Sequence, residues 1–224
     1  MPKLSKQKAQ APAYDGDWLA AGVVAAAALA AFLPALRGGF VWDDQANLVV
    51  NPIYRHLGPR QLEWMFTTFF MGPYQPLSWL SYWLDFQLWT MNPAGYHLTN
   101  LVLHAANAAV FFFIAKRLLP EDSRWTAALA GLFFAVHPLR VESVAWITER
   151  RDVLSGFFYL LAVLLYLQDR TRAALAAFVC SLLSKGIGIT LPLVLLVLDA
   201  YPMRRRFDLK MISLMLIKLK MPLS

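Results

Sequence analysis

The feature that most constrains this chain is a series of long apolar blocks. The first runs from Trp18 to Leu36 without a charged residue, which is close to the ~20 residues that a helix needs to cross a bilayer. Hydrophobic residues make up 58% of the chain and charged residues only 16%, too little polar surface for an ordinary soluble domain of this size. Further blocks follow at Leu98–Ala115, Trp125–Leu139, Val153–Leu167, Ala173–Leu183 and Ile187–Ala200. The sequence therefore predicts an all-α, polytopic transmembrane helix bundle of about six spans.

Basic residues predict how the bundle is oriented. With the N-terminus in the cytoplasm, alternate loops carry the basic clusters, as cytoplasmic loops of membrane proteins do. The formal net charge of +7 is explained by these short clusters, so nucleic acid is not expected as a partner, and the lipid bilayer is. The clusters are Lys116 with Arg117 and Arg124, then Arg170 with Arg172, then Arg204, Arg205 and Arg206.

The first block has an alternative interpretation as a signal peptide, because Lys3, Lys6 and Lys8 precede it. Its apolar run is longer than the 7–15 residues that are typical of a signal core. An uncleaved first span after a cytoplasmic tail, residues 1–17, is therefore preferred. The single cysteine, Cys180, excludes an intramolecular disulfide.

A polar and aromatic stretch, residues 37–97, separates the first two blocks and predicts a long extracytoplasmic loop. Two segments within it, Gly58–Phe69 and Leu77–Trp89, are expected to form short helices. The second is rich in tryptophan and tyrosine, which suits a helix in the membrane interface.

The second outer loop, residues 137–152, reads HPLRVESVAWITERRD and departs from the positive-inside rule. One interpretation is a solvated loop with local ion pairs. The other is that its arginines handle an anionic ligand, since paired guanidinium groups bind phosphate in bidentate fashion. The charged residues concerned are Arg140, Glu142, Glu149, Arg150, Arg151 and Asp152, with His137 at the start of the loop.

An acidic pair, Asp43 and Asp44, follows the first block and is expected on the same side as the second outer loop. Adjacent carboxylates can act as a general base or bind a divalent cation such as Mg²⁺, Mn²⁺ or Ca²⁺. A role in a turn or helix cap is the alternative for such a pair. The sequence leaves the metal question open.

Polar residues also lie inside the predicted spans. Asn100, His104 and Asn107 share one face of the second span. Hydrogen bonding between helices is the simpler interpretation. A non-enzymatic membrane protein, either a transporter fragment or a scaffold, is the alternative class that would rest on this face and on Pro192.

Four ordered segments carry a family resemblance. The strings FVWDDQANLVVNP, YQPLSWLSYWLDFQLW with NPAGYHLTNLVLHAANA, AVHPLRVESVAWITERRDVLSGFFYLLA, and TLPLVLLVLDAYP resemble the N-terminal membrane part of the transmembrane and tetratricopeptide-repeat protein O-mannosyltransferases and their bacterial relatives. The resemblance implies a GT-C type fold over residues 18–206. It also implies transfer of a sugar, mannose in this family, from a polyprenyl- or dolichyl-phosphate donor to hydroxyl groups of an acceptor protein on the extracytoplasmic side.

The resemblance also assigns roles to residues. Asp43 and Asp44 match the family's catalytic acidic pair, and Asp152, or less closely Glu142, matches a further acidic residue of the second outer loop. We expect Asp43 to be the base and Asp44 to support it. Arg150 or Arg151 would contact the phosphate, with Arg140 and His137 as further candidates. The membrane is expected to be a bacterial inner membrane or the endoplasmic reticulum.

The chain departs from the family's pattern at its C-terminal end. No tetratricopeptide repeat is visible, and residues 207–224 no longer resemble the family. We therefore expect a truncated form of a longer protein, and an inactive fragment is the alternative to an active one.

Overall fold

The computed structural model describes residues 15–120 and 123–201. Outside these residues lie most of the predicted N-terminal tail (residues 1–17), the basic cluster Arg204–Arg206 and the whole predicted C-terminal tail (residues 207–224). The described part is all-helical and contains no strand. Its longer helices are α1 (Asp15–Phe32), α2 (Pro59–Thr67), α3 (Pro76–Trp89), α4 (Pro93–Leu118), α5 (Arg124–Val136), α7 (Arg150–Leu167), α8 (Thr171–Ser184) and α9 (Leu191–Ala200). The shorter elements are η1 (Leu33–Arg37), η2 (Gln45–Val49), η3 (Ile53–Arg55), η4 (Pro138–Arg140), α6 (Val141–Ala145), η5 (Ile147–Glu149) and η6 (Gly186–Thr190).

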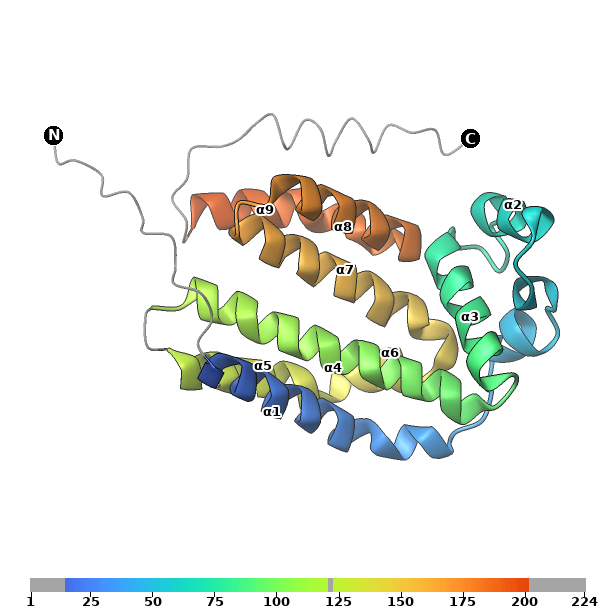
Figure 1. The fold of residues 1–224 in the computed structure, drawn as a ribbon, viewed down its shortest axis with the longest axis horizontal. Helices are drawn as coiled ribbons and strands as arrows, with labels where there is room; N and C mark the ends of the chain where they lie inside the picture. Colours follow the sequence, from blue (N-terminus) through green and yellow to red (C-terminus); the bar gives the residue numbers. More distant parts are fainter. Residues whose placement is uncertain (1–14, 121–122, 202–224) are drawn as a thin grey trace, which may run out of the picture.

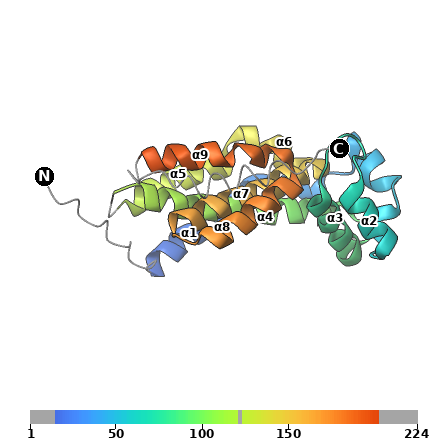
Figure 2. The same cartoon turned by 90° about the horizontal axis from the view of Figure 1, so that it is seen from above.

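The long helices lie side by side along the long axis of the molecule, and the first loop with α2 and α3 covers one end of them (Figure 1). We call this the loop end. Figure 2 shows α9, α5 and α6 along one side of the layer formed by α4 and α7. Each apolar block of the sequence corresponds to one of these helices, and both short helices expected in the first loop are present.

Local sequence signals set the limits of α4, the longest helix. Asn92 caps its start by accepting a hydrogen bond from the Ala94 N–H at 3.2 Å, and Pro93 occupies the first turn, where a missing N–H costs nothing. The helix stops at Leu118, just before Leu119 adopts an extended backbone ahead of Pro120, as a residue preceding proline prefers to do.

Two helices are long and apolar enough to cross a membrane, Gly16–Arg37 and Pro93–Leu118. A third candidate is the pair Arg124–Val136 and Pro138–Ala145, which is bent by 50° at the break between them. Helices α8 and α9 are apolar but shorter than a full crossing. The described residues thus contain two or three candidate spans by length and composition.

Small side chains bring the helices of the bundle close together. Helices α1, α4 and α5 share a buried cluster in which Ala28, Ala105, Ala108 and Ala135 pack around Val24. Such residues let helix backbones approach closely, which is how helices associate in lipid.

Helices α7 and α8 are joined by hydroxyl groups. The Ser155 and Ser181 hydroxyls lie 3.0 Å apart, and each also donates to the backbone carbonyl of the other residue. The Ser78 hydroxyl of α3 donates to the Ser184 carbonyl at the end of α8 at 3.1 Å, which attaches the loop to the bundle.

The first loop has an aromatic core to which the second loop contributes one residue, Ile147. Trp79 and Tyr82 of α3 are buried and pack with Tyr54, Met65 and Ile147. The aromatic residues that suggested an interfacial helix therefore do much of their packing inside the loop. Placement of α3 in the membrane interface stays a prediction.

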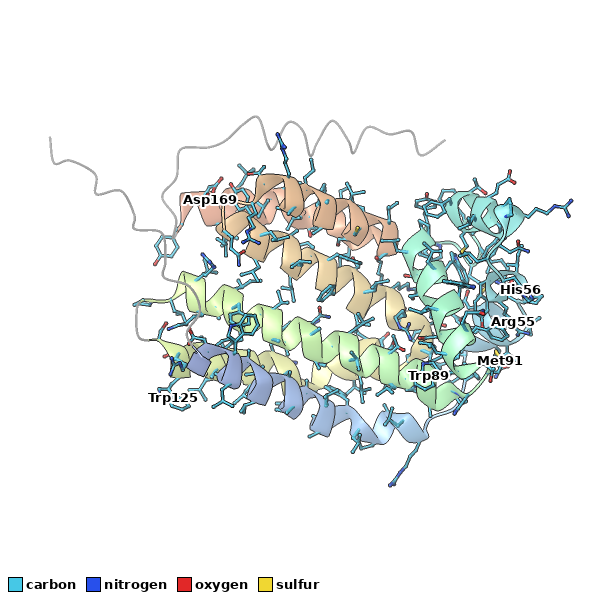
Figure 3. All side chains as sticks on the ribbon, viewed as in Figure 1. Arg55, His56, Trp89, Met91, Trp125 and Asp169 are labelled. Atoms are coloured by element: carbon cyan, nitrogen blue, oxygen red, sulfur yellow. The ribbon has the colours of Figure 1, made fainter. Side chains whose placement is uncertain are left out.

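The two ends of the bundle carry different residues. Figure 3 places Arg55, His56, Trp89 and Met91 at the loop end, and Trp125 and Asp169 at the opposite end. Because Arg124 precedes Trp125 and Arg170 follows Asp169, these basic residues lie away from the loop end. At that far end, Arg124 forms an ion pair of 2.8 Å with Asp17.

Candidate functional site

Asp44 joins the first loop to the second. Its side chain is fully buried, and one carboxylate oxygen accepts hydrogen bonds from the Thr148 N–H at 2.8 Å and the Thr148 hydroxyl at 2.6 Å. The other oxygen accepts from the Val41 N–H at 3.0 Å. Residues 44 and 148 are far apart in sequence, so these bonds place the acidic pair beside the charged end of the second loop. Asp44 thus has the turn-forming role considered from sequence as well as a connecting one.

Asp43 is placed differently from its neighbour. Its side chain is partly exposed, and no described residue donates a hydrogen bond to its carboxylate or pairs with it. The preceding residue, Trp42, has a φ of 50°, a left-handed conformation that is unfavourable for a bulky L-residue. The Trp42 ring packs edge-on against Trp146 of the second loop, with ring centroids 5.2 Å apart. This contact is a second link between the two loops at the acidic pair.

Arg150 is the centre of a buried polar network. Its guanidinium is fully buried and pairs with Asp85 of α3 at 2.6 Å. Its Nε donates to the Asn100 side-chain oxygen, and its Nη atoms donate to the Tyr96 carbonyl at 2.8 Å and to the Ser81 hydroxyl at 3.4 Å. These bonds tie α7, α4 and α3 together and leave little of the guanidinium for a ligand.

Asp85 is the acidic partner in that network, and the sequence analysis did not single it out. Burial raises the pKa of its carboxyl group, and Arg150 together with a hydrogen bond from Thr99 partly offsets this effect. The available signal was an acidic residue within the aromatic run WLDFQLW, since a buried carboxylate requires a partner.

Arg151, the next residue, belongs to a second cluster. It donates two hydrogen bonds to one oxygen of Glu149. Lys185, between α8 and α9, donates to the other oxygen of Glu149 at 3.0 Å and also to Asp152. Burial alone would raise the pKa of Glu149, but the hydrogen bonds from Arg151 and Lys185 outweigh it and lower that pKa. The local ion pairs considered from sequence are therefore present.

Three other predicted site residues belong to the same outer loop. The Arg140 guanidinium lies over the Phe134 ring, 4.4 Å from its centroid, and forms no hydrogen bond or ion pair with any described residue. The His137 Nδ1 accepts from the Leu139 N–H at 3.2 Å and caps η4, so this residue shapes a turn. Glu142 is exposed on α6.

The polar face of α4 makes hydrogen bonds between helices, as the simpler interpretation predicted. The Asn100 amide donates to the Val144 and Trp146 carbonyls, and the Asn107 amide donates to the Val153 carbonyl at 2.9 Å. His104 hydrogen-bonds to the Ala135 carbonyl at 2.9 Å through Nε2. These contacts hold the second outer loop and α7 against α4.

A metal site is not evident in the described part of the chain. Within residues 15–120 and 123–201, no three His, Cys, Asp or Glu side chains are grouped closely enough to hold an ion. The divalent cation considered for Asp43 and Asp44 stays a prediction.

The fold and the site together describe a helical membrane protein with an acidic pair, a buried arginine network and a charged cluster at one end. The chain is 33% identical over 207 residues to human protein O-mannosyl-transferase TMTC2, a match that covers 82% of this chain and 24% of that protein. It is 32% identical over 217 residues to human TMTC1 (84% and 24%). It is also 32% identical over 176 residues to the protein O-mannosyl-transferase F38B6.6 of Caenorhabditis elegans (72% and 25%).

These matches confirm the resemblance predicted from the sequence: the chain is homologous to part of the TMTC protein O-mannosyl-transferases. It spans about a quarter of the length of these relatives. No protein-family model matches the chain, and no solved structure does.

Proposed function

We propose that this chain is part of a membrane glycosyltransferase that transfers a sugar from a polyprenyl- or dolichyl-phosphate donor to protein hydroxyl groups. The relatives are named protein O-mannosyl-transferases, which supports mannose as the sugar and a protein as the acceptor. The membrane would be the endoplasmic reticulum or a bacterial inner membrane. The observation that carries the proposal is the junction of the two loops, where Asp44 binds Thr148 and leaves Asp43 without a partner among the described residues.

Asp43 is the base in this proposal. Its carboxylate takes the proton from the acceptor hydroxyl as that oxygen attacks the anomeric carbon of the sugar. The bond between the anomeric carbon and the phosphate oxygen breaks, and the lipid phosphate leaves with the bonding electron pair. Asp44, held by three hydrogen bonds, fixes the backbone beside the base.

The arginines divide between two tasks. Positive charge near the leaving phosphate stabilises the transition state. Arg140, which is exposed, and Arg151, which is partly buried beside Glu149, are the loop arginines outside the Arg150 network. Lys185 is a third cation of the same cluster. Arg150 becomes a positioning residue in this proposal instead of a phosphate contact, because its bonds to Asp85 and Asn100 hold the first turn of α7, which carries Arg151 and Asp152.

The proposed orientation in the membrane rests on the loop end of the bundle and the basic residues at its opposite end. About six spans of a GT-C-like bundle would place the loop end outside the cytoplasm and the basic residues near Arg117 and Arg170 inside it. Asp43 and the second outer loop then face the compartment that holds the acceptor. The transporter alternative loses its main support, because the amides of Asn100 and Asn107 are used to bind neighbouring helices.

The experiment is a transfer assay with the longer parent protein in sealed vesicles of known orientation. We expect a peptide acceptor that cannot cross the membrane to receive radiolabelled mannose from dolichyl-phosphate mannose, but not from a nucleotide-linked mannose. Transfer should occur only when the loop end faces that peptide. Transfer from the nucleotide-linked sugar, or from vesicles of the opposite orientation alone, would contradict the proposal.

A further inference from the structure

A cavity of about 290 Å³ lies within the bundle near the loop end. Its floor is formed by α4 and α7, and the end of α5 with η4 forms one wall and η6 another. Figure 2 shows α5 and α9, which follows η6, on the same side of the α4 and α7 layer. The volume lies just below the range of about 300–1,000 Å³ that is typical of small-molecule sites. None of the residues proposed above as the base or its support lines it.

One rim of the cavity carries a guanidinium that forms no hydrogen bond or ion pair with a described residue, and Asp152 lies near enough to interact with its charge. Arg140 lines the cavity together with Ser143 and Asp152. The Ser143 hydroxyl and Lys185 already bind Asp152, whereas the Arg140 guanidinium has no hydrogen bond or ion pair within the described residues. A planar guanidinium held against an aromatic ring is well placed to bind phosphate oxygens.

Other parts of the cavity lining are suited to hydrocarbon. Phe134, Val153, Leu160 and Ile187 contribute apolar surface to it. From Asp152 to Leu160, α7 advances about 12 Å at ~1.5 Å per residue. The cavity therefore extends from a charged rim at the loop end along helices that belong to the predicted spans, as an amphiphile with an anionic head requires.

Gly156 leaves the space open at the level of α7. A Cβ atom added there would meet only the Asn107 side-chain nitrogen, at an ordinary contact distance of 3.6 Å. Glycine in a helix interior costs about 1 kcal/mol relative to alanine, and here the missing side chain enlarges the cavity. Asn107 also has a buried side-chain oxygen without a hydrogen-bond partner in the described structure. The polar atoms of this wall are therefore not all satisfied by protein groups.

We propose that this cavity binds the phosphate-bearing end of a polyprenyl phosphate, with Arg140 on the phosphate and the first isoprene units along α7 above Gly156. The inference rests on the proposed function, which supplies the donor class, and adds where the carrier lipid lies.

The test is equilibrium binding of farnesyl phosphate, a short polyprenyl phosphate, to the full chain in lipid nanodiscs. Gly156→Leu fills the cavity and should weaken binding by roughly tenfold or more. Gly22→Leu is the matched control, because Gly22 lies exposed on α1 with nothing within 4 Å of an added Cβ, and it should bind as the wild type does. Arg140→Gln should also weaken binding by about tenfold.

Three further probes identify the part of the ligand that is recognised. Farnesol, which lacks the phosphate, should bind more weakly and be insensitive to Arg140→Gln. Inorganic phosphate should bind weakly and be insensitive to Gly156→Leu. Equal binding of lysophosphatidic acid, a straight-chain lipid phosphate, would assign the cavity to an ordinary phospholipid and overturn the proposal.

The result also separates this inference from the proposed function. If wild-type chain binds farnesyl phosphate and Gly156→Leu does not weaken it, the cavity is not the carrier's seat, although the donor class stands. If wild-type chain does not bind it, this inference fails, and transfer from dolichyl-phosphate mannose by the longer parent remains the separate measure of the proposed function.

Discussion

The surroundings of Arg150 and those of Asp152 are two charged regions at the loop end that differ in how far their charges are buried and paired. Around Arg150, the cation and Asp85 are both fully buried, and hydrogen bonds from three helices surround them. Around Asp152, Glu149 is buried but Asp152 and Lys185 are partly exposed, Lys185 bridges the two carboxylates, and Arg140 forms no hydrogen bond or ion pair with a described residue. The first region holds the loop on the bundle, and the second retains charge that a ligand can use.

The largest effect should come from breaking the Arg150 region. Arg150→Met leaves the buried Asp85 carboxyl without its counter-ion, so we expect a loss of about 3–5 kcal/mol in the free energy of unfolding. Thermal unfolding in detergent, followed by tryptophan fluorescence, measures it. Because replacing both members of a buried pair by apolar residues is often close to neutral, the double variant Arg150→Met, Asp85→Leu should recover most of the stability. A double variant as unstable as the single one would show that the pair is not the source.

A smaller effect should separate the two members of the acidic pair. Asp44→Ala removes the acceptor for the buried Thr148 N–H and hydroxyl, and leaving such donors unsatisfied costs about 1–3 kcal/mol. Asp43→Ala is the matched control and should change stability by less than about 0.5 kcal/mol, because no described group binds its carboxylate. The same unfolding assay compares them. Equal losses in the two variants would contradict the division of roles.

The smallest effect should come from the Asp152 region. A double-mutant cycle with Glu149→Gln and Lys185→Met should give a coupling energy of roughly 1 kcal/mol or less, because Lys185 is partly exposed to solvent while Glu149 is buried. The folded-state pKa of Glu149 lies below its ordinary value of 4.5. Its contribution to stability is therefore present above about pH 4.5 and is lost as the pH falls through the folded-state value. Unfolding curves of the wild type and Glu149→Gln should converge on acidification, and a difference that grows instead would reverse the sign.

The sequence predicted the helices well because their apolar blocks are long and are interrupted by proline and charge. It could not assign the arginines. Arg150 and Arg151 are consecutive, and at ~3.6 residues per turn they point about 100° apart on a helix. One therefore enters the protein and the other the outer cluster. To tell which of the two arginines points inward, one has to know the residue at which α7 begins. The apolar block begins only at Val153 and does not mark that residue. The partner of Arg150 was also out of reach, since Asp85 is 65 residues away and its pairing depends on how α3 folds back.

The acidic pair shows the same limit at closer range. Adjacent carboxylates in a turn look equivalent in sequence, and both were expected to serve a catalytic centre. The strained backbone at Trp42 and the contact with Thr148 direct one inward and leave the other partly exposed. Whether either acts on a substrate stays a prediction.

The most direct measurement of the central claim is the initial rate of mannose transfer by Asp43→Asn in the longer parent protein. The substitution keeps the size of the side chain and removes its basicity, and Asp43 has no described partner whose loss would disturb folding. The account predicts a fall of roughly 10²–10⁴-fold in transfer with membrane insertion and donor binding unchanged. Near-normal transfer by Asp43→Asn would contradict it.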